Sequence, residues 1–207
     1  DTLQRHQMSS VIETGARFLL NPSVKHAPTL LDQHADNVDV RVAFLNHCID
    51  MAAALGSDCV SLWSGAVPPG VDDGAAMTRL VAGLAPVLDH AHAKNVTIGL
   101  EPEPGVLIDT MTQFRRLLDR VQSPLLKLTL DIGHLHCLGE VPLAARIEQW
   151  ADLIVNVHLE DMVAGVHDHL MFGDGEIEFP PVIAALSAID YAGGVHVELS
   201  RHSHDAA

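Results

Sequence analysis

Short strands with one recurring polarity pattern constrain this sequence most. In residues 96–101 (VTIGLE), branched apolar residues alternate with threonine, glycine and glutamate, so one face is apolar and the other is small or polar. Residues 126–131 (LKLTLD), 155–158 (VNVH) and 195–199 (VHVEL) alternate in the same way. Strands of an open doubly wound sheet are apolar on both faces. A strand with one small or polar face instead fits a closed barrel, with helices outside, so we predict a (β/α)8 TIM barrel.

Longer stretches with helical apolar spacing lie between the strands. Strands that alternate with helices predict βαβ units and a parallel sheet in a single α/β domain. The predicted strands are Ser10–Glu13, Cys59–Trp63, Val96–Glu101, Leu126–Asp131, Leu153–His158 and Gly194–Glu198. The predicted helices are Asp36–Leu55, Asp72–Ala93, Asp109–Val121, Glu140–Trp150 and Pro180–Ile189.

A complete barrel of this kind has eight strands, and this sequence contains six. We therefore expect residues 1–207 to form one incomplete barrel domain, with the first two strands before residue 1 and the last helix after residue 207. A barrel that lacks two strands has unpaired edges, which is compatible with a homo-oligomer.

Composition narrows the functional classes. Asp and Glu number 27 against 12 Lys and Arg, a formal charge of −15 that repels phosphate backbones and anionic lipid, so we expect no nucleic acid partner. No apolar run approaches the roughly 18 residues of a membrane span, and the sequence carries no N-terminal signal pattern. Its three cysteines lie in apolar surroundings, which indicates reduced core residues of a cytoplasmic protein.

Four successive strands each end on an ionisable residue of the same parity. Parallel strands of a barrel present their carboxyl ends at one mouth, so these side chains should converge there. One imidazole and three carboxylates suit Mn²⁺, Mg²⁺, Co²⁺ or Zn²⁺. Unrelated polar residues at strand ends would not repeat one parity on four successive strands. The predicted metal ligands are Glu101, Asp131, His158 and Glu198.

A second group of polar residues follows the strand that ends at His158. His167 and His169 flank an aspartate in a predicted loop, and Gly173-x-Gly175 comes next. Either these histidines contribute to a metal site or they are solvated loop residues. Because Gly173-x-Gly175 precedes a strand-like segment (176–179) and not a helix, it predicts no nucleotide cradle, and we expect no nucleotide cofactor.

Four short motifs together resemble the xylose isomerase-like TIM-barrel superfamily. They are EPEP (101–104), DIGH (131–134), VHLED (157–161) and VEL (197–199). That group includes sugar and sugar-phosphate isomerases and epimerases, inosose dehydratase, 3-dehydroshikimate dehydratase and endonuclease IV. The resemblance implies that the four predicted ligands bind a divalent metal and that Glu101 and Glu198 also act as acid and base.

Endonuclease IV within this superfamily offers a more detailed resemblance. Residues 167–177 are similar to a segment of that enzyme, with His167 in place of an aspartate. The resemblance implies that His134, His167 and His169 form a second metal site or contact substrate. Two further histidine ligands of endonuclease IV are replaced here by Gly15 and Trp63, which argues against a three-zinc cluster and DNA repair.

The expected function is a metal-dependent isomerase or epimerase of a small polyhydroxylated carbonyl compound. The alternatives are a lyase or dehydratase of the 3-dehydroshikimate or inosose type, a phosphoesterase resembling endonuclease IV, and a non-catalytic barrel. Weaker substrate-binding candidates are Glu13 and Arg17 (or a structural pair), Trp63 (or core filler), and Lys25 and His26 (or solvated residues).

Overall fold

The strands assemble into one curved parallel sheet, which the computed structural model describes over residues 2–199. Its order is β1-β2-β3-β4-β5-β8, and every neighbouring pair is parallel. These six strands make up the greater part of a (β/α)8 barrel, as the polarity pattern predicts. The strands are β1 (Val11–Glu13), β2 (Cys59–Trp63), β3 (Ile98–Glu101), β4 (Leu126–Asp131), β5 (Ile154–Leu159) and β8 (Gly194–Val197).

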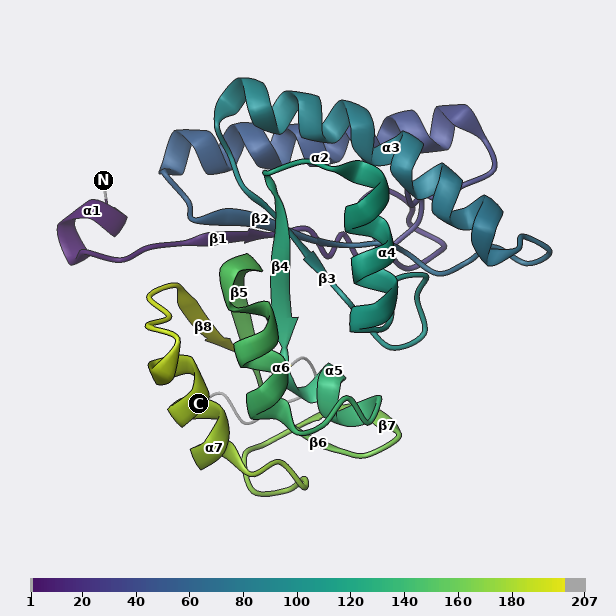
Figure 1. Ribbon diagram of the computed structural model, residues 1–207. Helices are drawn as coiled ribbons and strands as arrows, with labels where there is room; N and C mark the ends of the chain where they lie inside the picture. Colours follow the sequence, from purple (N-terminus) through teal and green to yellow (C-terminus); the bar gives the residue numbers. More distant parts are fainter. Residues whose placement is uncertain (1, 200–207) are drawn as a thin grey trace.

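Helices cover the outer, apolar face of this sheet. Figure 1 shows α2 and α3 running side by side on one flank, α6 and α7 together on another, and α1 projecting away from the sheet beyond β1. None of the helices described between residues 2 and 199 has the length and apolar composition that crossing a membrane requires. The helices are α1 (Thr2–His6), α2 (Ala35–Leu55), α3 (Asp73–Lys94), α4 (Met111–Val121), α5 (Ile132–Cys137), α6 (Leu143–Trp150) and α7 (Phe179–Ala188), with a 3₁₀ turn at Ala151–Leu153.

The long helices begin and end close to their predicted bounds. Asp72 and Thr110 cap α3 and α4 by accepting hydrogen bonds from backbone N–H groups, and Gly56 ends α2 in the left-handed conformation. Helix α6 starts three residues later than predicted, at Leu143, because residues preceding a proline such as Pro142 disfavour the helical region.

Two local predictions are wrong. Residues 166–170, expected as a loop, form strand β7, which pairs in antiparallel fashion with β6 (Asp161–Val163) outside the main sheet. Residues 176–179, expected as strand-like, lead into α7 without forming a strand. A short helix, α5, follows β4 directly and was not predicted.

The two faces of the strands follow the predicted parity. Leu126, Leu128 and Leu130 are almost fully buried under the helices. Small polar groups fill the opposite, inner face, where the Thr129 hydroxyl donates to Ser61 Oγ at 3.0 Å. A methyl group on Gly99 would lie 2.5 Å from Thr129 Oγ1, so glycine is required at this point of the interior.

Strand β8 is the exception to this packing. Val195 and Val197 were expected to pack under helices, but they are 45% and 58% exposed. The reason is position: β8 is an edge strand of the sheet, and no helix between residues 2 and 199 covers this part of it.

A buried arginine fixes the long loop between β1 and α2. Arg41 on α2 is 5% exposed, and its guanidinium donates to the carbonyl oxygens of Pro28 (2.7 Å), His26 (2.7 Å) and Thr14 (3.4 Å). Burial lowers the pKa of Arg41 to about 10, which still leaves it charged at neutral pH. The hydrogen bonds from the Arg41 guanidinium therefore fix the loop that carries Arg17, Lys25 and His26 against α2.

Replacing Arg41 by methionine should destabilise the protein. The Arg41→Met variant leaves buried carbonyl oxygens without a donor, so the free energy of unfolding should fall by roughly 2–3 kcal/mol. Urea unfolding followed by circular dichroism measures the change. The control is Arg116→Met on the exposed face of α4, where we expect a change within about 0.5 kcal/mol. Equal effects of the two substitutions would contradict the role of Arg41.

Candidate metal centre at the carboxyl ends of the strands

The four predicted ligands meet at the carboxyl ends of their strands. Glu101, Asp131 and His158 lie on β3, β4 and β5, and Glu198 directly follows β8. One potential ligand atom from each lies within 4.8 Å of the others. The sequence pattern thus identified a real cluster, and its members come together because parallel strands end at one edge.

His158 lies at the centre of this cluster. Its Nδ1 atom is 3.0 Å from Glu198 Oε2, 3.1 Å from Glu101 Oε1 and 3.9 Å from Asp131 Oδ2. Burial lowers the pKa of His158, but hydrogen bonds to Glu101, Glu13 and Glu198 outweigh it and hold that pKa well above its usual value. The three carboxylates therefore favour a positive charge at this point.

The carboxylates are removed from water to different degrees. The Glu101 and Asp131 side chains are 10% and 0% exposed, whereas that of Glu198 is 37% exposed. Burial raises the pKa of Glu101 to about 8. Buried negative charges are costly unless cations or donors compensate them.

A divalent cation fits this donor set. Asp131 Oδ2 is buried, accepts no hydrogen bond from the residues that the structure describes, and lies 3.9 Å from His158 Nδ1. Its other oxygen is occupied, since Asp131 Oδ1 accepts the backbone N–H of His134 at 2.7 Å. One oriented carboxylate oxygen is thus left free for a ligand, as a metal site of oxygen and imidazole donors requires.

A second cluster consists of imidazoles alone. His134 on α5 and His167 and His169 on β7 each offer a ring nitrogen within 4.8 Å of the other two. His134 Nε2 lies 3.1 Å from His167 Nε2, and His134 Nδ1 lies 3.1 Å from the carbonyl oxygen of Pro102. When Nδ1–H donates to that oxygen, the lone pair of Nε2 points into the cluster.

The surroundings of His134 and His167 favour their neutral forms. Burial lowers the pKa of His134. Burial and the neighbouring His134 and His169 also lower the pKa of His167 to about 4. Neutral imidazoles bind metals or accept hydrogen bonds from hydroxyl groups. The structure thus brings His134, His167 and His169 together, although two of them lie on a strand and not on a loop.

Both clusters open into one pocket of about 440 Å³. This volume suits a small molecule. The weaker candidates all line it, and Trp63 forms part of the wall, with its ring 5.3 Å from that of His26 in an edge-to-face contact. The pocket-lining candidates are Glu13, Arg17, Lys25, His26 and Trp63.

The side chain of Glu13 makes a contact that was not expected. Its Oε1 atom lies 3.1 Å from His158 Nε2 and accepts a hydrogen bond from Asn156 Nδ2 at 3.2 Å. Within residues 2–199, the ion pair of Glu13 is with His158 and not with Arg17. Neither Asn156 nor this link across the sheet was identified from the sequence.

Two further acids adjoin the candidate site. Glu160 is fully buried, and burial with the adjacent Asp131 raises its pKa to about 11, which favours the neutral form. Glu103 lines the pocket, and burial raises its pKa to about 7. In the sequence, both acids lie next to predicted ligands at strand ends, in the motifs VHLED and EPEP, and this proximity was the signal that pointed to them.

Asp161 organises the segment that joins β7 to α7. Its Oδ1 atom accepts the backbone N–H groups of Met162 (2.9 Å) and Ile177 (3.0 Å), and Oδ2 accepts that of Gly173 (2.8 Å). A methyl group on Gly175 would lie 2.3 Å from Asp161 Oδ1. The motif Gly173-x-Gly175 therefore lets the backbone wrap closely around the buried carboxylate of Asp161, and we call this segment the Asp161 wrap.

We expect Asp161→Asn to destabilise this wrap in a pH-dependent way. Burial raises the pKa of Asp161. The hydrogen bonds that it accepts from backbone N–H groups lower that pKa by more, so the net pKa lies below its usual value. Its stabilisation is complete above about pH 4 and is lost as the pH falls through the lowered pKa. The asparagine variant should lose about 1–3 kcal/mol of unfolding free energy at neutral pH, and less in acid.

Urea unfolding at pH 7 and pH 3 measures this difference. The matched control is Asp174→Asn, an exposed aspartate in the same segment. A deficit that stays constant with pH, or that appears equally in the control, would contradict the account.

Comparisons with known proteins agree on the fold. The family model described as xylose isomerase-like TIM barrel matches residues 6–207. A protein of Methanocaldococcus jannaschii, MJ1311, is 25% identical over 91% of this chain and 73% of its own length. The inosose dehydratase of Bacillus thuringiensis is 31% identical over 58% of this chain, and the match spans only 46% of that enzyme.

A solved structure has the same architecture. The crystal structure of a D-tagatose 3-epimerase-like protein superposes with a TM-score of 0.81 at 22% identity. The match covers 99% of this chain and 75% of that protein. At this identity the likeness establishes the shared barrel fold.

Proposed function

Because the chain belongs to the xylose isomerase-like TIM-barrel family, we propose that it is a divalent-metal-dependent isomerase or epimerase of a small polyhydroxylated carbonyl compound. The observation that carries the proposal is the cluster of Glu101, Asp131, His158 and Glu198 beside a pocket of about 440 Å³. The D-tagatose 3-epimerase-like protein, with the same fold, suggests a ketose as the first substrate to test.

The four clustered residues would hold one Mn²⁺, Mg²⁺, Co²⁺ or Zn²⁺ ion. When bound, the ion would polarise a substrate carbonyl and lower the cost of removing a proton from the adjacent carbon. The protein contributes the ligand geometry, because strand ends fix the backbone of three of these residues and burial restricts their side chains.

Two glutamates would carry the proton. Glu101 Oε1 and Glu198 Oε2 lie 3.1 and 3.0 Å from His158 Nδ1, and their strands, β3 and β8, are separated by β4 and β5. A substrate bound at the centre would therefore lie within reach of two carboxylates. One carboxylate takes the proton and the other returns it, which changes the configuration or moves the carbonyl group.

The rest of the pocket would bind the remainder of the substrate. Trp63 offers an apolar wall, and Arg17, Lys25 and His26 offer polar groups on the loop that Arg41 holds. The cluster of His134, His167 and His169 would either bind substrate hydroxyl groups or hold a second divalent ion. The number of ions bound per chain distinguishes these two roles.

A dehydratase is the second candidate. It is favoured by the likeness to inosose dehydratase, which extends over 58% of this chain. Proton removal beside a carbonyl can also lead to loss of a β-hydroxyl group as water. Incubation with inosose or 3-dehydroshikimate, followed by ultraviolet detection of a conjugated product, separates this reaction from isomerisation.

Metal content provides the first test of the site. We expect elemental analysis to find about one divalent ion per chain, or two if the histidine cluster also binds, and Asp131→Ala to remove one. The control is Asp89→Ala, on the exposed surface of α3, which should bind as many ions as the unchanged protein. Three zinc ions would instead favour a phosphoesterase, and no metal in any of these proteins would overturn the proposal.

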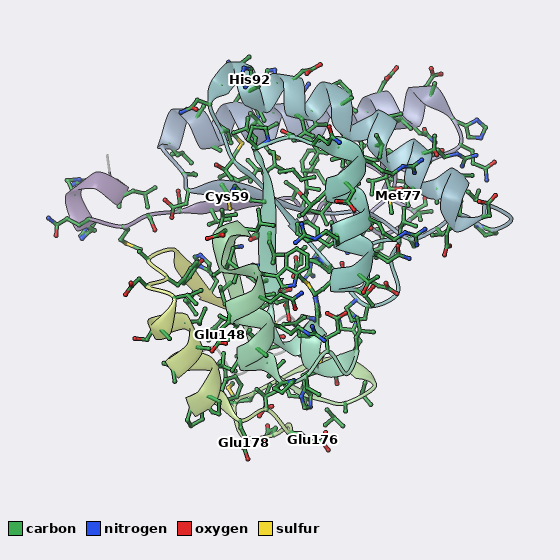
Figure 2. The ribbon with its side chains drawn as sticks, in the orientation of Figure 1. Cys59, Met77, His92, Glu148, Glu176 and Glu178 are labelled. Atoms are coloured by element: carbon green, nitrogen blue, oxygen red, sulfur yellow. The ribbon has the colours of Figure 1, made fainter. Side chains whose placement is uncertain are left out.

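Proton exchange provides the test of the chemistry. The unchanged protein should exchange a carbon-bound proton of a ketopentose or ketohexose in D₂O. Glu198→Gln should slow this exchange by about 10²–10⁴-fold, because amides cannot accept the proton. The control is Glu178→Gln, at the exposed start of α7 (Figure 2). If Glu198→Gln kept its metal and near-normal exchange, the assigned role would be wrong, and a non-catalytic barrel would show no exchange at all.

A further inference from the structure

The contact between Glu13 and His158 links opposite parts of the sheet. Glu13 ends β1 and His158 lies on β5, with three strands between them. Glu13 Oε1 reaches across the inner face to within 3.1 Å of His158 Nε2. Asn156, two residues before His158 on the same face of β5, is fully buried and donates to the same oxygen at 3.2 Å.

The two nitrogens of the His158 ring face different surroundings. Nδ1 faces Glu101, Asp131 and Glu198, the carboxylates of the proposed metal site. Nε2 faces Glu13 and Asn156. A ring nitrogen binds a metal only through its lone pair, so binding through Nδ1 requires the remaining proton to be on Nε2.

When a cation occupies Nδ1, the hydrogen bonds around Glu13 suit this tautomer. A carboxylate oxygen has two lone pairs and only accepts, whereas the amide nitrogen of Asn156 only donates. Glu13 Oε1 can therefore accept from Asn156 Nδ2–H and His158 Nε2–H together. The distance of 3.0 Å between Asn156 Nδ2 and His158 Nε2 is then the separation of two donors that converge on one acceptor.

We propose that Glu13 is a positioning residue for the metal site. Its carboxylate holds the Nε2 proton of His158 and so presents the Nδ1 lone pair to the cation. This inference rests on the proposed function, since it assumes that His158 binds a metal. Metal-bound histidines commonly donate their second N–H group to a carboxylate, and loss of that partner typically weakens metal binding 10- to 100-fold.

Metal titration of Glu13→Gln tests the proposal. The substitution keeps the size of the side chain and removes its charge, so the dissociation constant for Zn²⁺ or Mn²⁺ should rise about 10- to 100-fold, with the same number of ions at saturation. Glu13→Ala should weaken binding at least as much. The matched control is Glu148→Gln on the outer surface of α6 (Figure 2), which should bind like the unchanged protein.

A second measurement separates positioning from a general loss of structure. In the Zn²⁺-loaded protein, the His158 Nε2–H proton should give a downfield nuclear magnetic resonance signal typical of a hydrogen bond to a carboxylate. Glu13→Gln should shift this signal upfield. Thermal unfolding of the metal-free variants shows whether they are folded, and if Glu13→Ala fails to fold, Glu13→Gln decides.

The outcomes distinguish this inference from the proposed function. If the unchanged protein binds no divalent ion, the metal site itself is wrong. If it binds the ion, and Glu13→Gln binds with unchanged affinity and an unchanged Nε2–H signal, the positioning role is overturned while the metal site stands. A higher KM for substrate with unchanged metal affinity would likewise overturn positioning and assign Glu13 to substrate binding.

Discussion

Three carboxylates and one imidazole, contributed by four strands, converge within 4.8 Å of one another at the mouth of the barrel. Such a group is unfavourable in isolation, because burial removes water from Glu101 and Asp131 while their charges repel. It persists only where the surrounding backbone cannot relax. The parallel strands supply that rigidity, since their leucines are packed under helices and their inner faces are filled by small polar groups. The pocket, the histidine cluster and the contact of Glu13 with His158 are all arranged around this point.

Two buried ionic side chains of opposite sign hold irregular segments of the chain. Arg41 donates to the carbonyl oxygens of the loop after β1, and Asp161 accepts the N–H groups of the segment after β7. Each satisfies backbone groups that would otherwise lack partners inside the protein. Long irregular segments are thereby fixed beside the candidate site without regular secondary structure. This explains how exposed residues such as Lys25 belong to a defined pocket.

The two ligand clusters share a boundary but differ in chemistry. The carboxylate-rich cluster suits hard or borderline divalent ions, whereas a cluster of three imidazoles suits borderline ions or hydroxyl groups. Asp131 joins them, because its Oδ1 accepts the backbone N–H of His134 and its Oδ2 faces the first cluster. Glu101 also approaches the second cluster, since its Oε1 atom lies 3.6 Å from His134 Nδ1, so a change at one cluster should alter the other.

The sequence by itself determined the barrel and the four predicted ligands, because strand parity is local: a residue two positions along a strand lies on the same face whatever the rest of the chain does. Parity and the rule that parallel strands end together were enough to bring Glu101, Asp131, His158 and Glu198 to one place. Only the tertiary structure decided the pairing of β6 with β7, the raised pKa of Glu160 and the contact from Glu13 to His158. These depend on sheet curvature, burial and distances between residues up to 145 positions apart, which no local pattern encodes.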